Sequence, residues 1–403
     1  MHYHTTGSLS FDHIGLGSVA GWLILIAFGI KSAFPFLHSW LTDGYPEATA
    51  TGTVFLSAFT TKVAVYALAR SFAGEEILIY IGVTMACFPI FFAVIENDLR
   101  KVLAYSLINQ VGFMVTGIGI GTALALNGAV AHAFSDVIFK GLLFMTMGAV
   151  LYRVGHVKGS DLGGLYKTMP KTTVFCIVGA LSISAFPLFS GFVSKSMVMT
   201  ALMYENHGYL WLFMLFASAG VFHHAGIKIP YFAFFAHDSG LRPKDAPVNM
   251  LIAMGLAAAL CIFIGTQPQY LYALLPMEVD YWPYDTTHVL AQLQLLFFSA
   301  MAFVWLNKQG LYPPELHSTN LDAEWLYRKL LPAGVQRSLT FLSNVKESSM
   351  AALISPMHGI RNSFTQSSIA KYHLAESWPT GSMVFWIAII LVSYLLLDIL
   401  IYS

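Results

Sequence analysis

The chain has 403 residues, of which 57% are apolar and only 10% are charged. Soluble domains carry about 25% charged residues, so this composition excludes an ordinary soluble fold. The formal net charge is zero and Lys and Arg form no run, so nothing indicates binding to nucleic acid. The three cysteines lie in apolar segments without CxxC spacing, which argues against a disulfide framework or a zinc site. No metal and no cofactor is predicted.

Windows of about 20 mostly apolar residues, the length that crosses a bilayer as a helix, occur ten times in the chain. The sequence therefore predicts an all-α polytopic membrane protein with about ten transmembrane helices. The predicted spans are residues 17–38, 51–70, 77–95, 102–122, 127–152, 172–191, 208–229, 248–267, 287–306 and 382–402.

Three regions follow from these spans. Residues 1–306 form a transmembrane core of nine spans, and residues 382–403 form a C-terminal transmembrane helix. The polar segment 307–381 mixes Trp325 and Leu330 with Arg328, an amphipathic pattern that suits a position along the membrane surface or a docking surface for another subunit.

The distribution of basic residues predicts the orientation. If the spans alternate in direction, the loops 96–101, 153–171 and 230–247 lie on one side with eight Lys and Arg, and the opposite loops hold only Arg70 and Lys195. Cytoplasmic loops are enriched in Lys and Arg, so the first set, together with 307–381, is predicted to be cytoplasmic. Both termini are then expected on the outer side.

Four lysines fall inside predicted spans: Lys31, Lys62, Lys140 and Lys228. Each costs about 2.5–3.5 kcal/mol at a helix centre, on the order of 10 kcal/mol for all four, which indicates a function. The alternative is that they reach the membrane surface, which is most plausible for Lys228 near a span end.

Two of these lysines precede a proline. Pro35 follows Lys31 and Pro230 follows Lys228. Proline frees carbonyls one turn back, which at membrane depth is tolerated where they line a cavity. Two such interruptions predict broken helices at corresponding positions of an inverted repeat, as in transporters.

The stretch HAFSDVIFK places His132, Asp136 and Lys140 four residues apart. Residues at this spacing stack along one helix face over about 12 Å. The ladder predicts a proton relay, because imidazole titrates near neutrality and desolvated carboxylates and amines shift toward it. The alternative is a structural Asp136–Lys140 ion pair, which would not require His132.

Four further residues are accessory candidates. His223 and His224 lie one turn before Lys228. Asp43 and Glu47 follow Pro35 and could line an outlet, although a solvated loop explains them equally well.

Several blocks resemble, in order and spacing, the proton-translocating antiporter-like subunits shared by respiratory complex I and Mrp-type sodium/proton antiporters. The resemblance covers residues 17–306, and the segments after residue 222 resemble the D-type Mrp subunits more closely than complex I. The blocks are GIKSAFPFLHSWLTDGYPEATA, FTTKVAVYALAR, ENDLRKVLAYSLINQVGFM, HAFSDVIFKGLLF, DLGGLYKTMPKTTVFCIVGALSISAFPLFSGFVSK, HHAGIKIPYFAFFAHDSGLRPKD and NLDAEWLYRKL.

The resemblance implies two inverted five-helix repeats, each with a broken helix that bears a lysine. Lys31 resembles the broken-helix lysine of the first repeat, Lys62 the lysine on the next helix, and Lys228 the broken-helix lysine of the second repeat. Lys140 and His132 resemble the central relay. Asp136 departs from the family, in which His is common at that position.

The resemblance also implies several N-terminal helices, one with a membrane-embedded Glu, which this sequence lacks ahead of Lys31. We expect a partner or a longer chain to supply them. The implied function is a proton-conducting subunit of a multi-subunit Na⁺ or K⁺/proton antiporter in the plasma membrane of a prokaryote. The alternatives are a proton-pumping subunit of a complex I-like oxidoreductase, and a non-conducting scaffold or an uptake subunit for another solute such as inorganic carbon.

Overall fold

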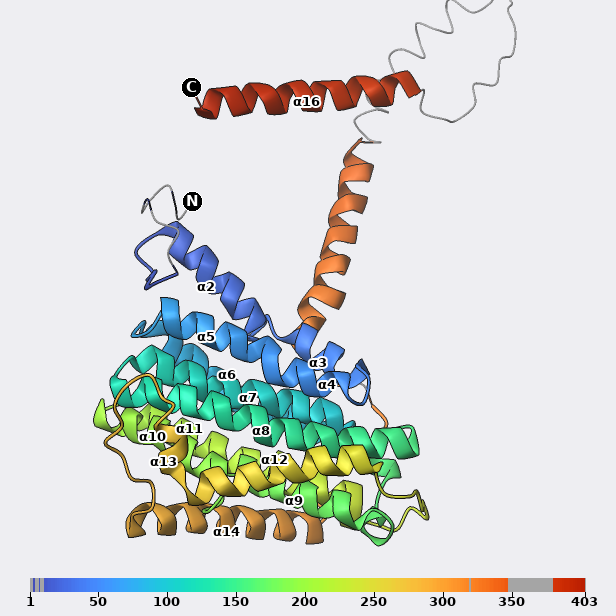
Figure 1. The fold of residues 1–403 in the computed structure, drawn as a ribbon. Coiled ribbons are helices and arrows are strands. Elements are labelled where there is room, and N and C mark those ends of the chain that lie inside the picture. Colours follow the sequence, from blue (N-terminus) through green and yellow to red (C-terminus); the bar gives the residue numbers. More distant parts are fainter. Residues whose placement is uncertain (1–2, 4–6, 8–10, 319, 347–379, 403) are drawn as a thin grey trace, which may run out of the picture. The chain divides into compact units, whose positions relative to one another are not determined.

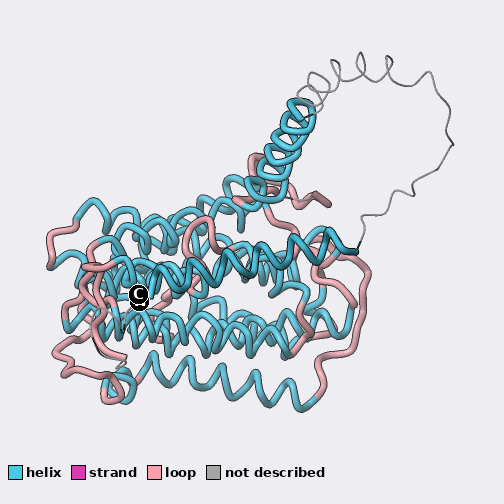
Figure 2. The backbone as a smooth tube through the Cα atoms, turned by 90° about the horizontal axis from the view of Figure 1, so that it is seen from above, coloured by secondary structure: helices cyan, strands magenta, loops and turns pink. Residues whose placement is uncertain are grey.

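A computed structural model describes residues 3, 7, 11–318, 320–346 and 380–402. Within these ranges the regular structure is helical and no strand occurs, which confirms the predicted all-α class (Figure 2). The chain divides into two compact units, Met1–Lys329 and Leu330–Ser403, which are described separately. Part of the predicted polar segment, residues 347–379, lies outside the described residues.

Seven helices of the described chain are long and apolar enough to cross a membrane, and each coincides with a predicted span. Two of them include π-helical turns, namely α4–η1–α5 and α11–η4–η5. The seven are α4–η1–α5 (Gly52–Ser71), α6 (Ile77–Ile95), α7 (Leu99–Ile120), α8 (Ala123–Val154), α11–η4–η5 (Gly208–Phe235), α12 (Val248–Thr266) and α14 (Thr286–Lys308).

Two further predicted spans form broken crossings. The first consists of α2 (Val19–Lys31) and α3 (Ser39–Glu47), and the second of α9 (Pro170–Ile183) and α10 (Ser190–Tyr204). The longest half has 15 residues, about 22 Å of helix, so neither half alone covers a hydrocarbon core of about 30 Å. The break that Pro35 predicts after Lys31 is confirmed.

The two breaks share a four-residue sequence and a backbone conformation. SAFP occurs at residues 32–35 and again at 184–187. In both, the alanine and the residue three positions later adopt positive φ: Ala33 at 63° and Phe36 at 67°, Ala185 at 57° and Leu188 at 75°. Left-handed conformations disfavour residues with a Cβ, so packing must hold both breaks in place.

The break predicted at Pro230 is wrong. The chain stays helical from Gly208 to Phe235 and passes through two π-helical stretches, η4 (Phe222–Lys228) and η5 (Tyr231–Phe235). A π-helical turn shifts the hydrogen-bond register, which lets the helix accommodate a residue without an N–H. The second broken crossing lies instead at 184–189, inside the predicted span 172–191.

The centre of the first unit is α7, which lies between α6 and α8 (Figure 1). Almost its whole surface is buried. Glycines allow the close approach to α6: a Cβ on Gly112 would lie 2.5 Å from Ala86 N, and one on Gly119 would lie 2.5 Å from Ile79 N. Small residues at such contacts are typical of helix packing in membranes.

The loops gather at two ends of the bundle. The loops predicted to be cytoplasmic contact one another: Gly159 N donates to Asn97 O at 2.9 Å, and Lys167 pairs with Asp238 at 2.6 Å. We call this the charged end. At the opposite end, Asn127 Nδ2 donates to Met277 O at 2.9 Å.

The two broken crossings run in opposite directions between these ends. Just before α2, Leu16 N donates to Glu75 at the uncharged end, and in the last turn of α3, Pro46 O accepts from Arg100 of the charged end at 2.8 Å. In contrast, α9 begins at the charged end, where the Lys171 backbone N–H donates to Asp245 at 3.1 Å. This antiparallel pair is what an inverted repeat produces.

After α14 the chain returns across the charged end. Residues 309–329, of which 319 is not described, form what we call the return segment. In the second unit, residues 331–346 are helical and α16 (Thr380–Tyr402) covers the last predicted span. The short helices are η2 (Gly159–Asp161), η3 (Leu165–Lys167), α13 (Pro268–Tyr272) and η6 (Leu326–Leu330).

Candidate functional site

The polar ladder of α8 lies in the interior of the bundle. His132, Asp136 and Lys140 are each fully buried. α8 packs against α7, α10, the π-helical segment η1 (Leu56–Thr60) and α5 (Thr61–Ser71), and the partners of the ladder come from α7, α10 and α5.

The partner of Asp136 is Lys62, not Lys140 as in the alternative that the sequence left open. The Lys62 amine and the Asp136 carboxylate form an ion pair, and the lysine is only 9% exposed. Lys62 also donates to Ser57 O at 2.9 Å. Lys62 lies just after η1, and the carbonyl that its amine binds belongs to this π-helical turn, five residues earlier.

His132 binds through both ring nitrogens. Its Nδ1 lies 3.0 Å from Ser194 Oγ and its Nε2 lies 3.1 Å from Gln110 Oε1. The ring is flanked by Phe113 and Phe139. A histidine with two polar partners on different helices has a fixed ring orientation, which a proton relay requires.

Lys195 is buried, although the predicted spans place it in an outer loop. It lies on α10 and is 2% exposed, its amine donates to Ile183 O at 3.2 Å, and it sits 4.9 Å from the centre of the Phe113 ring. The predicted span ended at residue 191, whereas α10 continues to Tyr204 and so includes Lys195. The repeated SAFP sequence could have revealed the second break and with it this lysine.

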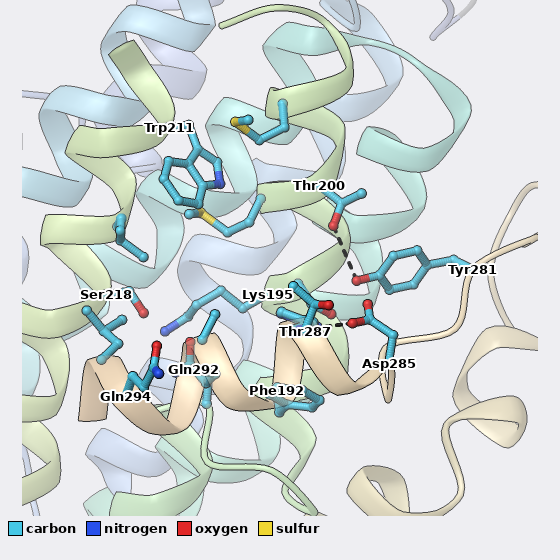
Figure 3. A pocket seen from close by; sticks show the side chains of 18 of the residues that line it. Phe192, Lys195, Thr200, Trp211, Ser218, Tyr281, Asp285, Thr287, Gln292 and Gln294 are labelled. Atoms are coloured by element: carbon cyan, nitrogen blue, oxygen red, sulfur yellow. Dashed lines mark hydrogen bonds between the residues drawn. The ribbon is translucent and has the colours of Figure 1, made fainter. Parts of the chain in front are cut away.

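A cavity of about 750 Å³ connects Lys195 with the uncharged end. Lys195 extends into it with its amine toward Ser218 and Gln292 (Figure 3). Near the mouth, Tyr281 and Asp285 belong to the wall, and Tyr281 Oη lies 3.3 Å from Thr200 Oγ1. A titratable amine at the base of a partly polar cavity has a route for protons or ions.

In the opposite direction along α8, Lys140 leads toward the charged end. Its amine donates to Leu103 O at 3.2 Å. His224 is fully buried on η4, four residues before Lys228. His223 lies on the other side of η4, against Phe303 and Tyr312.

Lys228, the last residue of η4, is fully buried and its amine packs against the C-terminal end of α6. It donates to Ala93 O at 3.2 Å, to Val94 O at 2.6 Å and to Glu96 O at 2.7 Å. Glu315, on the return segment, forms an ion pair with it at 2.9 Å. The prediction that Lys228 lies on a broken helix is wrong, because the helix is continuous from Gly208 to Phe235. Its amine is buried inside the bundle and does not reach the membrane surface.

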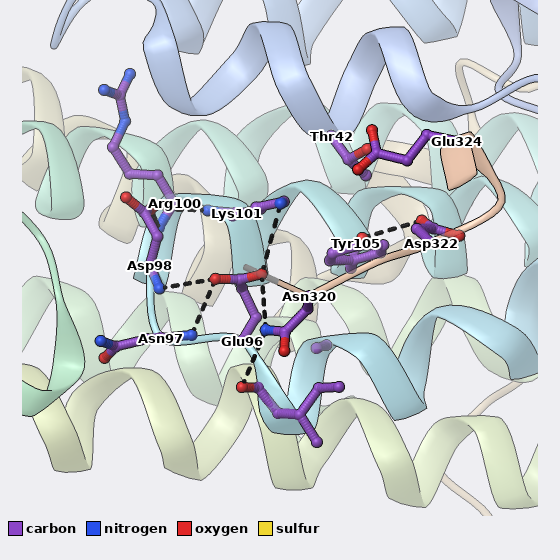
Figure 4. Close-up of polar contacts among 12 residues, drawn as sticks. Thr42, Glu96, Asn97, Asp98, Arg100, Lys101, Tyr105, Asn320, Asp322 and Glu324 are labelled. Atoms are coloured by element: carbon purple, nitrogen blue, oxygen red, sulfur yellow. Dashed lines mark hydrogen bonds and ion pairs between the residues drawn. The ribbon is translucent and has the colours of Figure 1, made fainter. Parts of the chain in front are cut away.

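The return segment supplies a second carboxylate, Asp322. Its Oδ2 accepts from Tyr105 Oη at 2.9 Å and pairs with His38 at 2.8 Å. Figure 4 shows Asp322 beside Tyr105 and Asn320 beside Glu96, to which Asn320 donates at 3.2 Å. No sequence pattern indicates these contacts, because they join residues more than 200 positions apart.

The carboxyls of the return segment titrate differently. Burial raises the pKa of Glu315, and Lys228 counteracts only part of this effect. Burial acts in the same direction on Asp322, but the bonds from His38, Ala323 N and Tyr105 outweigh it and hold its pKa below the ordinary value.

Three of the candidate residues predicted from the sequence lie apart from these buried groups. Lys31 is exposed on the described chain and sits 5.4 Å from the centre of the Trp40 ring. Asp43 forms an ion pair with Arg328 of the return segment, and Glu47 is exposed at the end of α3.

The features above define a class: an all-helical membrane protein with two antiparallel broken crossings and a line of buried titratable groups. The family model described as NADH:quinone oxidoreductase/Mrp antiporter, transmembrane, matches residues 1–222. The chain belongs to this family.

Similar proteins come from several branches of the family. The chain is 27% identical to hydrogenase-4 component B of Escherichia coli K12 over 66% of this chain and 46% of the relative. It is 28% identical to NADH-ubiquinone oxidoreductase chain 5 of Phytophthora infestans, over 73% and 47%. It is 27% identical to antiporter subunit mnhD2 of Staphylococcus aureus, over 65% and 57%. The chain thus spans about half the length of these curated relatives.

Solved structures share the fold. A chain of the Mrp complex from Dietzia sp. DQ12-45-1b matches with a TM-score of 0.62 at 22% identity, covering 67% of this chain and 61% of that chain. A chain of the membrane-bound sulfane sulfur reductase, an archaeal respiratory membrane complex, matches with a TM-score of 0.64 at 24% identity, covering 98% and 72%.

Proposed function

We propose that the chain is the proton-conducting membrane subunit of a multi-subunit monovalent cation/proton antiporter. The observation that carries this proposal is an interior line of titratable groups that extends from one end of the bundle toward the other. From the charged end it runs through Glu315, Lys228, His224, Lys140, Asp136, His132 and Lys195 to the cavity at the uncharged end.

The steps of this line along α8 and on to α10 are short. Asp136 lies one helical turn from both Lys140 and His132, about 6 Å along the axis. His132 contacts Ser194, the neighbour of Lys195 in the chain, at 3.0 Å. Buried hydroxyls beside the line, on Thr61, Ser106 and Ser135, have no hydrogen-bond partner among the described residues, and buried polar groups of this kind are usually satisfied by water. Amines, imidazole and water can pass a proton along such a line by reversible charging.

The orientation belongs to the same proposal. The charged end faces the cytoplasm of a prokaryotic cell, because it holds most of the loop Lys and Arg, and the cavity beside Lys195 opens to the outside. Both termini then lie outside, residues 1–306 form the conducting core, 307–381 lies on the cytoplasmic side, and 382–403 crosses the membrane once more.

The partners in this proposal are other membrane subunits, the lipid bilayer, protons and a cation, Na⁺ or K⁺. The neighbouring folds come from multi-subunit membrane complexes, which supports assembly with other subunits. Lys31 would meet such a subunit or a preceding segment, because its face is open on the described chain.

The alternative is a proton-pumping subunit of a complex I-like oxidoreductase. The relative named NADH-ubiquinone oxidoreductase chain 5 favours it at 28% identity. Any redox reaction would then take place in partner subunits, and the chain itself would not be an enzyme. Co-purification with iron–sulfur subunits would support this alternative over the antiporter.

The test is ΔpH-linked cation exchange in inverted membrane vesicles that contain the chain with its partners. Lys140→Ala and Lys195→Ala each remove one group of the line, and we expect the exchange rate to fall at least about tenfold, which is about 1.4 kcal/mol in the barrier. Lys308→Ala is the matched control, because this lysine is exposed at the end of α14. Exchange at the wild-type rate in both line variants, with normal amounts of protein in the membrane, would contradict the proposal.

A further inference from the structure

The end of α6 surrounds the Lys228 amine with four oxygen atoms. Three are backbone carbonyls, at 3.2 Å (Ala93), 2.6 Å (Val94) and 2.7 Å (Glu96). The fourth is Glu315 Oε1 at 2.9 Å. We call these four atoms the oxygen cage.

The cage follows from the way α6 ends. The last carbonyls of a helix have no partner within the helix and carry the negative end of its dipole. Here the backbone turns extended at Glu96, so the carbonyls of Ala93, Val94 and Glu96 point to one spot, and Ile95 O instead accepts from Asn320 at 3.3 Å. A positive charge is favoured at such a helix end, and the Lys228 ammonium supplies it.

The cage offers one oxygen more than an ammonium group can use. A lysine amine has three N–H donors, and four oxygens lie within 3.2 Å of Nζ. Four or more oxygens, from backbone carbonyls and a carboxylate, are the coordination that an alkali cation receives where proteins replace its hydration shell.

Of the carboxylates of Glu96 and Glu315, which both lie near Lys228, only that of Glu315 belongs to the cage. The Glu96 carboxylate points away from Lys228: it accepts from Asn97 N and from Asn320, and Lys101 lies 3.6 Å from it (Figure 4). Among the described residues, Lys228 is the basic side chain that pairs with Glu315. The other titratable groups that face this region are His223 and His224 on η4 and Tyr312 on the return segment.

We propose that the oxygen cage is a monovalent cation site, for Na⁺ or K⁺, in which the ion and the Lys228 ammonium replace each other. When Lys228 releases one proton to the interior line, its amine becomes neutral, and one cation enters beside the Glu315 carboxylate. The charge in the cage is unchanged, and one proton is exchanged for one cation. This inference rests on the proposed transport function and names the site where the cation binds.

The test is the melting temperature of the purified full chain in lipid nanodiscs, in NaCl, KCl and choline chloride at equal ionic strength. Lys228→Met keeps the side-chain length and removes the ammonium. We expect a saturable rise in its melting temperature with NaCl or KCl but not with choline chloride. If the cage of the wild type is free in about a tenth of the molecules, the half-saturating concentration falls about tenfold in the variant.

Further variants separate a site from a helix cap. Lys228→Met combined with Glu315→Gln loses the carboxylate and should lose the response, whereas Lys308→Met should behave like the wild type. If Lys228→Met does not fold, Glu315→Gln alone serves, because it should remove the response that the wild type shows at high NaCl or KCl. Equal melting temperatures of Lys228→Met in the three salts would show that Lys228 only caps α6. If Lys228→Met does not fold, equal melting temperatures of the wild type in the three salts would show the same.

The outcome is independent of the exchange assay. Melting requires no transport, so a negative result here would leave the proton line intact as a proposal. Wild-type exchange in Lys140→Ala would contradict the proton line and leave the cage to be judged by its own salt response.

Discussion

Asp136 is the only carboxylate among the ladder residues of α8, and it lies next to three basic side chains. One turn along the same helix are His132 and Lys140, and across the interface it forms an ion pair with Lys62. A buried carboxylate is costly unless it is paired, and the same holds for the lysine. The pair therefore places both charges at a depth where neither would be stable alone.

A double-mutant cycle tests this mutual dependence. Asp136→Asn leaves Lys62 buried without its counter-charge, and Lys62→Met does the same to Asp136, so each should lower the free energy of unfolding by about 3–5 kcal/mol. The double variant should recover part of this loss, since no unpaired charge is left. Chemical denaturation in detergent measures the three values.

The control pair is Lys167 and Asp238, which lie 2.6 Å apart at the charged end with more than 40% of each side chain exposed. Their single variants should each leave the free energy of unfolding nearly unchanged. Strictly additive effects of Lys62→Met and Asp136→Asn would show that the buried pair is not coupled.

At the level of single residues, the sequence predicted burial better than partners. Lys62, His132 and Lys140 lie well inside apolar segments, so hydropathy alone placed them in the interior, and the structure has them buried. Their partners come from helices distant in sequence, so the pairing of Asp136 with Lys62 was out of reach. Lys195 was missed because an apolar window does not reveal where a break divides a crossing.

Among the elements, the two breaks show what local sequence encodes. In both, SAFP follows a helix and the chain resumes as a second helix after a few residues. Proline alone was an incomplete guide: Pro35 ends a helix, whereas Pro230 lies between two π-helical turns of a continuous one. The difference comes from tertiary packing, which is not visible in a single segment.

The second break depends on close packing at its C-terminal side. A Cβ on Gly191 would clash with Ser182 O, at the carbonyl end of α9. Gly191→Ala should therefore displace the start of α10, and with it Lys195, at a cost of about 1–3 kcal/mol in unfolding free energy. The exchange rate should fall together with stability, because the lysine moves relative to His132.

Gly44 provides the matched control on the first broken crossing. It lies within α3 and does not adopt positive φ, and a Cβ added to it would have no other atom within 4 Å. Gly44→Ala should be neutral or stabilise by about 1 kcal/mol, the helix preference of alanine over glycine. An unchanged melting temperature and exchange rate in Gly191→Ala would mean that the break tolerates rearrangement.

At the scale of the whole first unit, the return segment joins elements that the chain separates. It contacts α3 through Asp43, α7 through Tyr105, and the start of α3 through His38. Through these contacts the return segment covers the charged end and places its own Glu315 beside Lys228. Its amphipathic composition was visible in the sequence, but its docking on the bundle was not, because the partners are polar groups at helix ends.

The docking should depend on pH through Asp322. Its pKa lies below the ordinary value, so the stability from its contacts is present above the unfolded value of about 3.9 and is lost as pH falls through the lower, folded value. We expect the protection of the return segment's amides, relative to the intrinsic exchange rate at each pH, to stay high from neutral pH down to about pH 4 and to fall only below it.

Substitution of Asp322 by asparagine should remove this transition, because an amide does not titrate in this range. Asp322→Asn replaces the carboxylate that serves both His38 and Tyr105 by a neutral amide, at a cost of about 1–3 kcal/mol, so protection around Trp325 should be lower already at pH 7. Asp161→Asn is the control, because its pair with His317 on the same segment is more than a third exposed and should matter little. Equal protection in Asp322→Asn and the wild type would show that the segment is held by its other contacts, and the pH step should then be absent from both.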